Sequence, residues 1–524
     1  MSFNKIPSFP ATIVTFLIIY LHGLSVFLVA GAYFKIQPFR PTTFQWGFSS
    51  GLYPQIHLFM ISVIRMATAR LAPWLLLLVC VLSVLRTESV DVVNTIVTDA
   101  VKKGAVCLDG TPPAYALHKG VGDAANNWLI YLEGGGWCAT EAECVFRTTK
   151  DVGSTKRWAV EKSSLIAMLS DQESENPYFY NWTRVYVRYC DGSSYVGDRE
   201  KPYVGNNTTV YFRGARVFKA VMEDLLEKGL KHASNALLTG CSAGGLGALL
   251  QCDNFRSILP EKAKVKCAAD AGFFIDGTDI YGGHMHRERF AQIVQTHESQ
   301  KNLPKSCTSK MDASLCMLPQ NFVADIKTPL FVVNSVYDTW QIENILMPVK
   351  KDQLAVHDEF ASCGHDIENC TCDQVKLWRG FQSEFYQALA QLNSSSSNGM
   401  FINACASHCQ TQKQETWFGT STMPKLRDRP AGSLQGVGEA VGEWFVNDAE
   451  MRRVDYRTKT PLVCEYNPEE PHWNNHYTFR GTNLFNPAYT LADEIKRKTS
   501  LIPRCPAEIP AYFQQPLLCI AGLC

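Results

Sequence analysis

A glycine-rich turn between a strand-like run and a helix-like run constrains the fold of this chain most. Residues 236–239 are apolar, residues 240–245 read Gly-Cys-Ser-Ala-Gly-Gly, and residues 246–250 are typical of a helix. In this setting Gly-x-Ser-x-Gly is the pattern of a nucleophile elbow, a tight turn that presents a serine at a helix N-terminus. The pattern predicts Ser242 as a nucleophile. The alternative interpretation is an ordinary glycine-rich turn of a sheet protein.

A second glycine run lies about a hundred residues earlier and also follows an apolar run. Residues 128–132 are strand-like, and residues 133–138 read Glu-Gly-Gly-Gly-Trp-Cys. In proteins with a nucleophile elbow, a loop after an earlier strand supplies part of the oxyanion hole. The pair of motifs, in this order, predicts that the N–H groups of Gly136, Trp137 and Ala243 stabilise an oxyanion. Taken alone, the glycine run is equally typical of a plain turn.

Strand-like and helix-like runs alternate from residue 90 onward, without a clear linker or repeat. This alternation predicts an α/β fold, with a mostly parallel sheet covered by helices on both faces, in a single domain over residues 90–524. The strand candidates are residues 128–132, 184–188, 236–239, 265–269, 330–334 and 401–403. The helix candidates are residues 214–228, 244–252, 287–295, 373–392 and 434–447.

An acid and a base must follow the serine if the elbow is catalytic, in the order Ser, acid, His. Asp338 follows a strong apolar run and is the predicted acid, although it also suits a helix N-cap, and Asp270 is the main rival. His408 is the predicted base because it lies between Cys405 and Cys409, which would hold its loop rigid. His365 is a weaker candidate, since no strong strand precedes it.

Charge and cysteine content narrow the functional class. The chain has 50 basic and 50 acidic residues, which argues against a nucleic-acid-binding protein. Of its 19 cysteines, Cys80 lies in an apolar targeting segment, and the other 18 are dispersed. Dispersed cysteines of even number in an exported chain predict disulfides rather than a zinc site, and no cofactor or metal is expected. Whether Cys241 is bridged or free is left open.

The amino-terminal part carries two apolar segments. Residues 66–89 have the charged start and the apolar core of a secretory signal peptide, which makes residues 1–65 an extension of the gene prediction. The alternative is a membrane anchor at residues 11–33, which are long enough to span a bilayer. Glycosylation motifs at Asn181, Asn206, Asn207, Asn369 and Asn393 are consistent with export.

Together these motifs resemble the pectin acetylesterases of plant cell walls and, more distantly, the animal Notum carboxylesterases of the α/β-hydrolase superfamily. The resemblance covers roughly residues 90–516. It rests on five ordered blocks, which are residues 132–138, 187–192, 240–245, 334–338 and 403–409. The resemblance implies a secreted, metal-independent enzyme with Ser242 as nucleophile, Asp338 as orienting acid and His408 as base. It also implies Gly136, Trp137 and Ala243 as oxyanion donors, and acetylated pectin as the substrate.

Two alternatives remain at this point. One is a deacylase of another acylated substrate, as Notum is, and the other is a non-catalytic cell-wall glycoprotein that keeps the scaffold. A polyanionic substrate would favour basic groups near the site, for which Arg188, Arg199, Lys201 and Arg213 are candidates. For each of these four, ordinary surface charge is the more common interpretation.

Overall fold

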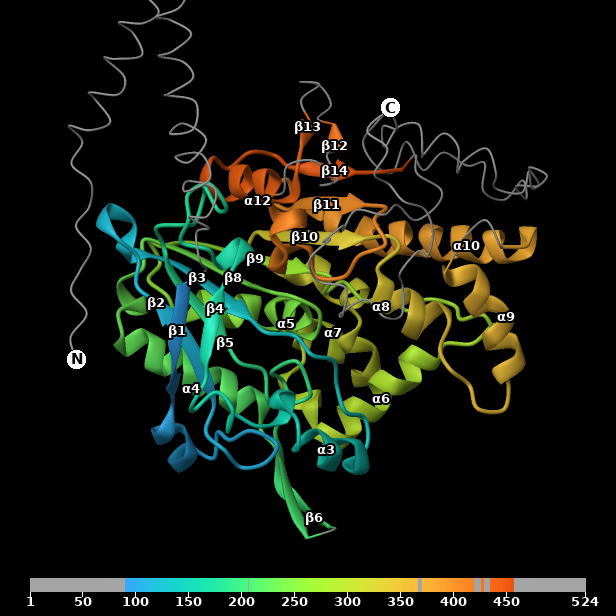
Figure 1. Ribbon diagram of the computed structural model, residues 1–524, viewed down its shortest axis with the longest axis horizontal. Helices are drawn as coiled ribbons and strands as arrows, with labels where there is room; N and C mark the ends of the chain where they lie inside the picture. The colour runs from blue at the N-terminus through green and yellow to red at the C-terminus, as the bar shows by residue number, and fades with distance from the viewer. Residues whose placement is uncertain (1–89, 206, 366–369, 419–425, 428–433, 457–524) are drawn as a thin grey trace, which may run out of the picture. The chain divides into compact units, whose positions relative to one another are not determined.

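A ten-stranded sheet forms the centre of the domain (Figure 1). The computed structural model describes residues 90–205, 207–365, 370–418, 426–427 and 434–456. Seven neighbouring strands of the sheet run parallel, in the spatial order β14 (Arg452–Val454), β11 (Gly399–Asn403), β10 (Leu330–Ser335), β9 (Lys264–Asp270), β8 (Asn235–Gly240), β3 (Asn127–Leu132) and β5 (Thr183–Val187). Three antiparallel pairings then add β2 (Ala114–His118), β1 (Val90–Ile96) and β4 (Lys162–Leu165).

Strand β3 is the point from which the chain builds the sheet in both directions. It pairs with β5 on one side and with β8 on the other, so that Ile130 lies opposite both Val185 and Leu238. In open α/β sheets, ligands bind at the carboxyl ends of the strands where the strand order reverses in this way. The glycine run after β3 and the serine after β8 both lie at such ends, next to one another in the sheet.

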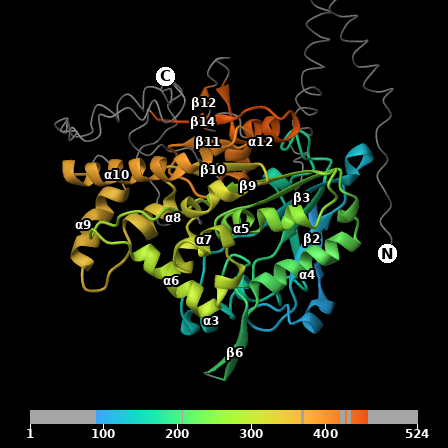
Figure 2. The ribbon, with the colours of Figure 1, turned by 180° about the vertical axis from the view of Figure 1, so that it is seen from behind.

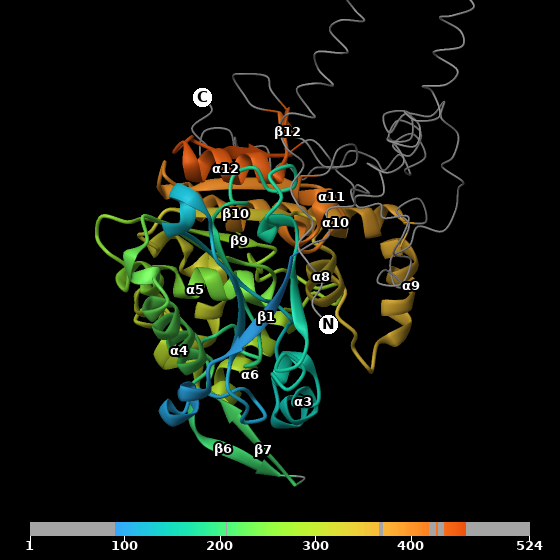
Figure 3. The same cartoon turned by 60° about the vertical axis from the view of Figure 1, so that its left-hand side comes forward.

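Helices cover both faces of the sheet, as the alternating side chains of its strands require. Trp128, Ile130 and Leu132 belong to one buried cluster, whereas Leu129 and Tyr131 belong to the opposite one. The first cluster includes residues of α4 (Gly214–Glu227), α5 (Ala243–Ser257), α6 (Met285–His297) and α10 (Cys372–Leu389) (Figure 2). The second includes residues of α11 (Gln414–Trp417) and α12 (Val437–Val446) (Figure 3). The predicted α/β class with helices on both faces is therefore confirmed.

Shorter elements and disulfides complete the described part of the domain. The helices are α3 (Glu141–Arg147), α7 (Lys305–Thr308), α8 (Thr339–Gln341) and α9 (Leu354–His365), and β6 (Arg199–Gly205) pairs with β7 (Thr208–Phe212) in a separate hairpin. The short strands β12 (Leu426–Arg427) and β13 (Leu434–Gln435) form another antiparallel pair. Disulfides link Cys107 to Cys190, Cys138 to Cys144, Cys241 to Cys409, Cys252 to Cys267 and Cys307 to Cys316. The prediction of a disulfide-rich fold is thus confirmed.

The predicted leader lies outside the described residues. This applies to the extension or anchor in residues 1–65 and to the signal peptide in residues 66–89. Within the described ranges, none of the helices is long and apolar enough to cross a bilayer. Residues 457–524 also lie outside the described part.

Candidate active site

The predicted nucleophile lies in the sharp turn between β8 and α5. Ser242 has φ 57° and ψ −126°, a conformation that non-glycine residues seldom adopt. Its N–H donates a hydrogen bond of 3.0 Å to the carbonyl oxygen of Asp270 at the end of β9. Ser242 is largely buried, with 6% of the residue exposed. This backbone is the one that the elbow pattern predicts.

The glycine run after β3 packs directly against this turn. A Cβ atom added to Gly134 would lie only 2.9 Å from the Cβ of Ser242, so this close approach requires glycine. Gly136 has φ 66°, the left-handed region that favours glycine. Within the described ranges, the N–H groups of Gly136, Trp137 and Ala243 have no hydrogen-bond acceptor. Three unpaired donors therefore belong to two loops that meet at Ser242.

Arg147, at the end of α3, holds the carbonyl groups of this glycine run. Its Nη2 donates to the carbonyl oxygen of Gly135 at 2.6 Å and to that of Gly136 at 3.3 Å, and the Tyr189 hydroxyl also donates to Gly136, at 2.9 Å. In a trans peptide the C=O group and the following N–H lie in one plane and point in opposite directions. Fixing these two carbonyl groups therefore fixes the N–H directions of Gly136 and Trp137, the predicted oxyanion donors.

Replacing Arg147 by methionine is expected to lower kcat for a small neutral ester such as p-nitrophenyl acetate. The expected loss is up to about 10²-fold with little change in KM, because misdirected N–H groups stabilise the transition state less. Arg147→Lys, which keeps a donor, should recover part of the loss. Arg256→Met is a matched control, since Arg256 also donates to two carbonyl groups, those of Pro260 and Glu261. Equal kcat values for the two methionine variants would contradict this role.

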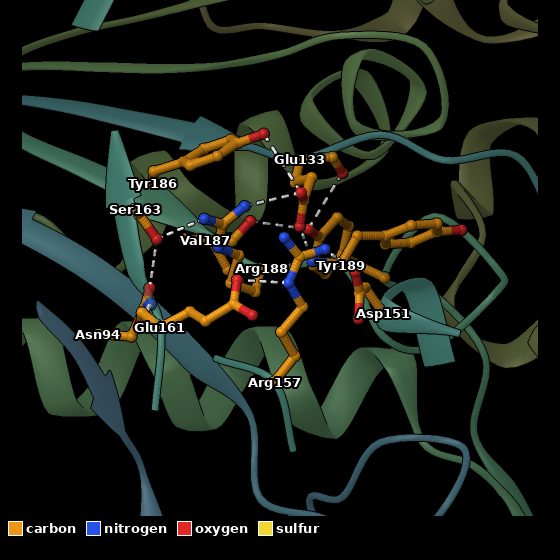
Figure 4. A network of polar contacts seen from close by, with 11 residues as sticks. Asn94, Glu133, Asp151, Arg157, Glu161, Ser163, Tyr186, Val187, Arg188 and Tyr189 are labelled. Carbon is orange, nitrogen blue, oxygen red and sulfur yellow. Dashed lines mark hydrogen bonds and ion pairs between the residues drawn. The ribbon is translucent and has the colours of Figure 1, made fainter. Parts of the chain in front are cut away.

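Glu133 anchors the start of the glycine run through a buried polar network (Figure 4). One carboxylate oxygen accepts from the Arg188 guanidinium at 2.8 Å, and the other accepts from the Tyr189 N–H at 2.9 Å. Arg188 is 5% exposed, and its guanidinium lies 3.5 Å from the centre of the Trp158 ring. Such a buried pair is costly to break from one side only, because the remaining charge would be left unpaired. The network thus fixes the loop where it leaves β3.

The predicted acid and base are hydrogen-bonded to each other. Nδ1 of His408 lies 2.7 Å from Oδ2 of Asp338, which is 1% exposed, while the His408 side chain is 19% exposed. The other carboxylate oxygen accepts from the N–H of Gln341 at 3.0 Å, so Asp338 is also the N-cap of α8. Burial disfavours the charged imidazole, but attraction and hydrogen bonding from Asp338 outweigh it, so the pKa of His408 is raised.

A disulfide joins the base loop to the elbow. Cys409, after His408, is bonded to Cys241, before Ser242, and a ring nitrogen of His408 lies within 4.8 Å of the Cys241 sulfur. Cys241, whose state the sequence left open, is therefore bridged. Cys405, on the other side of His408, is disulfide-bonded as well. The N–H of Thr339 also donates to the carbonyl oxygen of Ser407, at 3.4 Å, so the acid and base segments are in contact.

Asp270, the rival acid, supports the base loop instead. Its Oδ2 accepts from both the N–H and the hydroxyl of Thr411, each at 2.7 Å. Burial raises its pKa to about 6, partly offset by these hydrogen bonds. The imidazole of His408 pairs with Asp338, so the geometry favours Asp338 as the acid. His365, the rival base, is the last residue of α9.

Three of the four basic residues expected near a polyanion are engaged in ion pairs. Arg188 is buried against Glu133, Arg199 lies 3.0 Å from Glu141, and Arg213 is bonded to the carboxylate and the carbonyl oxygen of Glu200. Lys201 lies on the exposed β6–β7 hairpin. Arg188, Arg199 and Arg213 are therefore weak candidates for binding a polyanion, because carboxylates of the fold already pair with them.

Two clusters of described residues have the spacing of metal ligands, and each contains a disulfide. One joins Cys138, Cys144 and His297, and the other joins Cys241, Cys409 and His408. Cysteine binds metals as the thiolate, which a sulfur atom in a disulfide does not provide. Neither cluster in this oxidised state therefore offers a thiolate site for zinc.

Residues that position the site were missed by sequence reasoning to different degrees. Glu133 and Tyr189 lie within the motif blocks, so proximity to those motifs was an available signal. Arg147 lies outside every block, and only the folded arrangement brings its guanidinium to the glycine run. Its contact depends on the turn between β3 and α3 rather than on a local pattern.

Comparison with known proteins finds relatives that cover most of this chain. The family model for pectinacetylesterases matches residues 85–465. Pectin acetylesterase 11 of Arabidopsis thaliana is 43% identical over 382 residues, which cover 73% of this chain and 94% of that protein. Pectin acetylesterase 7 of the same plant is 42% identical, over 74% of this chain and 95% of its own length.

More distant similarities concern the Notum proteins. Palmitoleoyl-protein carboxylesterase notum2 of Xenopus laevis is 30% identical over 48% of this chain and 52% of its own length. The crystal structure of the Wnt deacylase Notum from Drosophila superposes with a TM-score of 0.56 at 22% identity, covering 71% of this chain and 98% of that one. At that identity the structural similarity establishes the fold alone.

Proposed function

Because the chain belongs to the pectinacetylesterase family and is an esterase, we propose that it is a secreted enzyme that hydrolyses acetyl esters of pectin through Ser242, His408 and Asp338. The observation that carries the mechanism is the 2.7 Å hydrogen bond between His408 and Asp338. The loop that contains His408 is also joined by a disulfide to the elbow. Disulfides of this number are typical of proteins that work outside the cytosol, which supports secretion.

The proposed reaction proceeds through an acetyl-enzyme. His408 accepts the proton of the Ser242 hydroxyl while the serine oxygen bonds to the ester carbonyl carbon. The N–H groups of Gly136, Trp137 and Ala243 stabilise the resulting oxyanion, and Asp338 stabilises the imidazolium. The intermediate collapses, the sugar hydroxyl leaves with the proton from His408, and the serine remains acetylated. His408 then activates water, which releases acetate and restores the free serine.

A packed aromatic cluster next to the oxyanion loop supports a short acyl group. The ring of Trp137 contacts those of Phe274, Phe290 and Trp340, with centres 5.0, 5.2 and 5.4 Å apart. His286 packs among them, and burial lowers its pKa to about 3, so this ring is neutral. Trp137 follows the glycine run, Phe274 follows β9 and Trp340 follows Asp338. The cluster is therefore built from segments next to the proposed site, where an acyl pocket would lie. Trp137, Phe274 and Phe290 are buried and packed against one another, so this cluster itself offers no room for a long acyl chain.

Esters of different acyl length test the competing deacylase function, which the similarity to Notum raises. With p-nitrophenyl acetate and octanoate, we expect kcat/KM to be more than about tenfold higher for the acetate, because the packed rings exclude the longer chain. Comparable values, or a preference for octanoate, would favour the deacylase.

The polymer is tested by acetate release from acetylated pectin beside acetylated xylan. Faster release from pectin is the expected result. Release from xylan alone would contradict the proposed substrate. Release from neither polymer, with the nitrophenyl esters still hydrolysed, would favour the deacylase.

A further inference from the structure

A groove begins at the oxyanion loop and runs along α3. It has a volume of about 520 Å³, within the range of roughly 300–1,000 Å³ that ligand sites occupy. Trp137 lines the groove, α3 supplies Glu143, Phe146 and Arg147, and Lys150 lies just beyond the helix. Arg289 of α6 also lines it. Because Trp137 carries a predicted oxyanion donor, a ligand in this groove would lie beside the reacting ester.

The charges of the groove favour an anion. Arg289 is paired with Glu143 at 3.0 Å, but Arg147 and Lys150 have no carboxylate partner among the described residues. The half-buried Arg147 uses Nε for the carbonyl oxygen of Val152 and Nη2 for the glycine run. Its Nη1 has no acceptor in the described part of the chain, and desolvation lowers the guanidinium pKa. Arg147 and Lys150, three residues apart, thus form no direct ion pair with a described carboxylate, although the charges of Asp191 and Glu133 still favour the charged form of Arg147.

An exposed aromatic ring lies beside these cations. Phe146 is 65% exposed, and the Lys150 ammonium lies 4.9 Å from its ring centre. An exposed large apolar side chain beside a groove is typical of a binding surface, and a flat ring suits the C–H face of a sugar. An exposed aromatic ring in contact with the Lys150 ammonium matches an acidic sugar, which has one apolar face and a carboxylate.

We propose that this groove binds a galacturonate unit of the pectin chain near the acetylated unit. Its carboxylate pairs with Lys150 and with Nη1 of Arg147, while its ring packs on Phe146. This proposal rests on the proposed function for its substrate, but it assigns a separate binding surface. It explains selectivity for an anionic polymer without the basic residues that the sequence suggested.

Charge reversal at Lys150 tests the groove without altering the reacting groups. With acetylated polygalacturonate, Lys150→Glu is expected to raise KM by about tenfold, because the carboxylate then meets a like charge. Phe146→Ala should raise KM by several-fold. For the small neutral p-nitrophenyl acetate, both variants should keep kcat/KM within about twofold of the wild type, since this ester does not reach the groove.

Lys262→Glu is the matched control, because Lys262 is exposed in the loop between α5 and β9, at the amino-terminal end of β9, whereas the site lies at the carboxyl ends of the strands. An equal rise in KM for Lys262→Glu and Lys150→Glu would overturn the proposal. The proposal would also be overturned if Lys150→Glu lost as much activity, relative to the wild type, on the nitrophenyl ester as on the polymer.

A binding measurement separates failure of the groove from failure of the proposed function. Unacetylated oligogalacturonate is titrated calorimetrically into Ser242→Ala, with and without Lys150→Glu. Binding that Lys150→Glu weakens about tenfold supports the groove even if no acetate is released from pectin. No binding to Ser242→Ala, while the wild type releases acetate from pectin, would overturn the groove and leave the proposed function standing.

Discussion

Replacement of Ser242 by alanine is expected to abolish acetate release, with a loss in kcat of about 10⁵–10⁶-fold. The change removes only the hydroxyl oxygen that would bond to the ester carbonyl carbon. Ser242 is already held at φ 57° with a Cβ atom, so alanine imposes no new backbone strain. The expected midpoint of thermal unfolding is within about 2 °C of the wild type, because the change removes one atom from a residue that is 6% exposed and adds none. Acetate release and thermal unfolding are measured on the same sample.

Ser257→Ala provides the control for this variant. Ser257 ends the helix that Ser242 precedes, and its hydroxyl donates to the carbonyl oxygen of Asn254 on the surface. This second serine-to-alanine change should leave the rate of acetate release unaltered. If folded Ser242→Ala released acetate as fast as Ser257→Ala, Ser242 would not be the nucleophile.

Replacement of Asp338 by asparagine is expected to lower kcat by about 10⁴-fold. The carboxylate accepts the Nδ1 hydrogen bond of His408, which leaves Nε2 free to act as the base. An amide group in its place can donate to Nδ1, and this holds the imidazole in the wrong tautomer. The asparagine oxygen can still accept from the Gln341 N–H, so the cap of α8 is retained. Fold stability should therefore change far less than the rate.

The same variant is expected to move the pH profile. In the wild type the pKa of His408 is raised, and only the neutral imidazole can accept the serine proton. The logarithm of kcat/KM should therefore rise with pH and level off above the ordinary histidine pKa of about 6.5. Without the Asp338 charge, burial lowers the pKa, so the acid limb of the residual activity should shift to lower pH. An unshifted limb, or a rate near that of the wild type, would contradict the role of Asp338.

Much of the parallel sheet could be predicted because its strands are short apolar runs between turn residues. β3, β8, β9 and β10 are buried on both faces, so their sequences lack polar alternation and are easily found. The antiparallel edge was missed for physical reasons. In β1 the apolar Val93 is exposed and the polar Asn94 is buried, so its sequence carries no regular alternation. β2 reads Ala-Tyr-Ala-Leu-His, a composition equally suited to a helix.

The candidate site likewise contains residues that the sequence predicts and residues that only the folded structure reveals. Motifs indicate residues whose backbone geometry is demanding, such as Ser242 at its positive φ and Gly136 in its loop. They do not indicate long-range partners, because nothing in the local sequence records which side chain folds back on a given carbonyl group. The contact of Arg147 with Gly135 and the disulfide between Cys241 and Cys409 arise from tertiary structure alone. The groove along α3 has the same origin.

The central claim is that Ser242 is a nucleophile activated by His408, and a fluorophosphonate probe tests it most directly. The probe reacts covalently with activated serines, and peptide mass spectrometry then identifies the labelled residue. The predicted result is a label on the peptide that contains Ser242, formed together with the loss of esterase activity and greatly slowed in Asp338→Asn. Full esterase activity with Ser242 unlabelled, or inactivation through a label on another residue, would contradict the account.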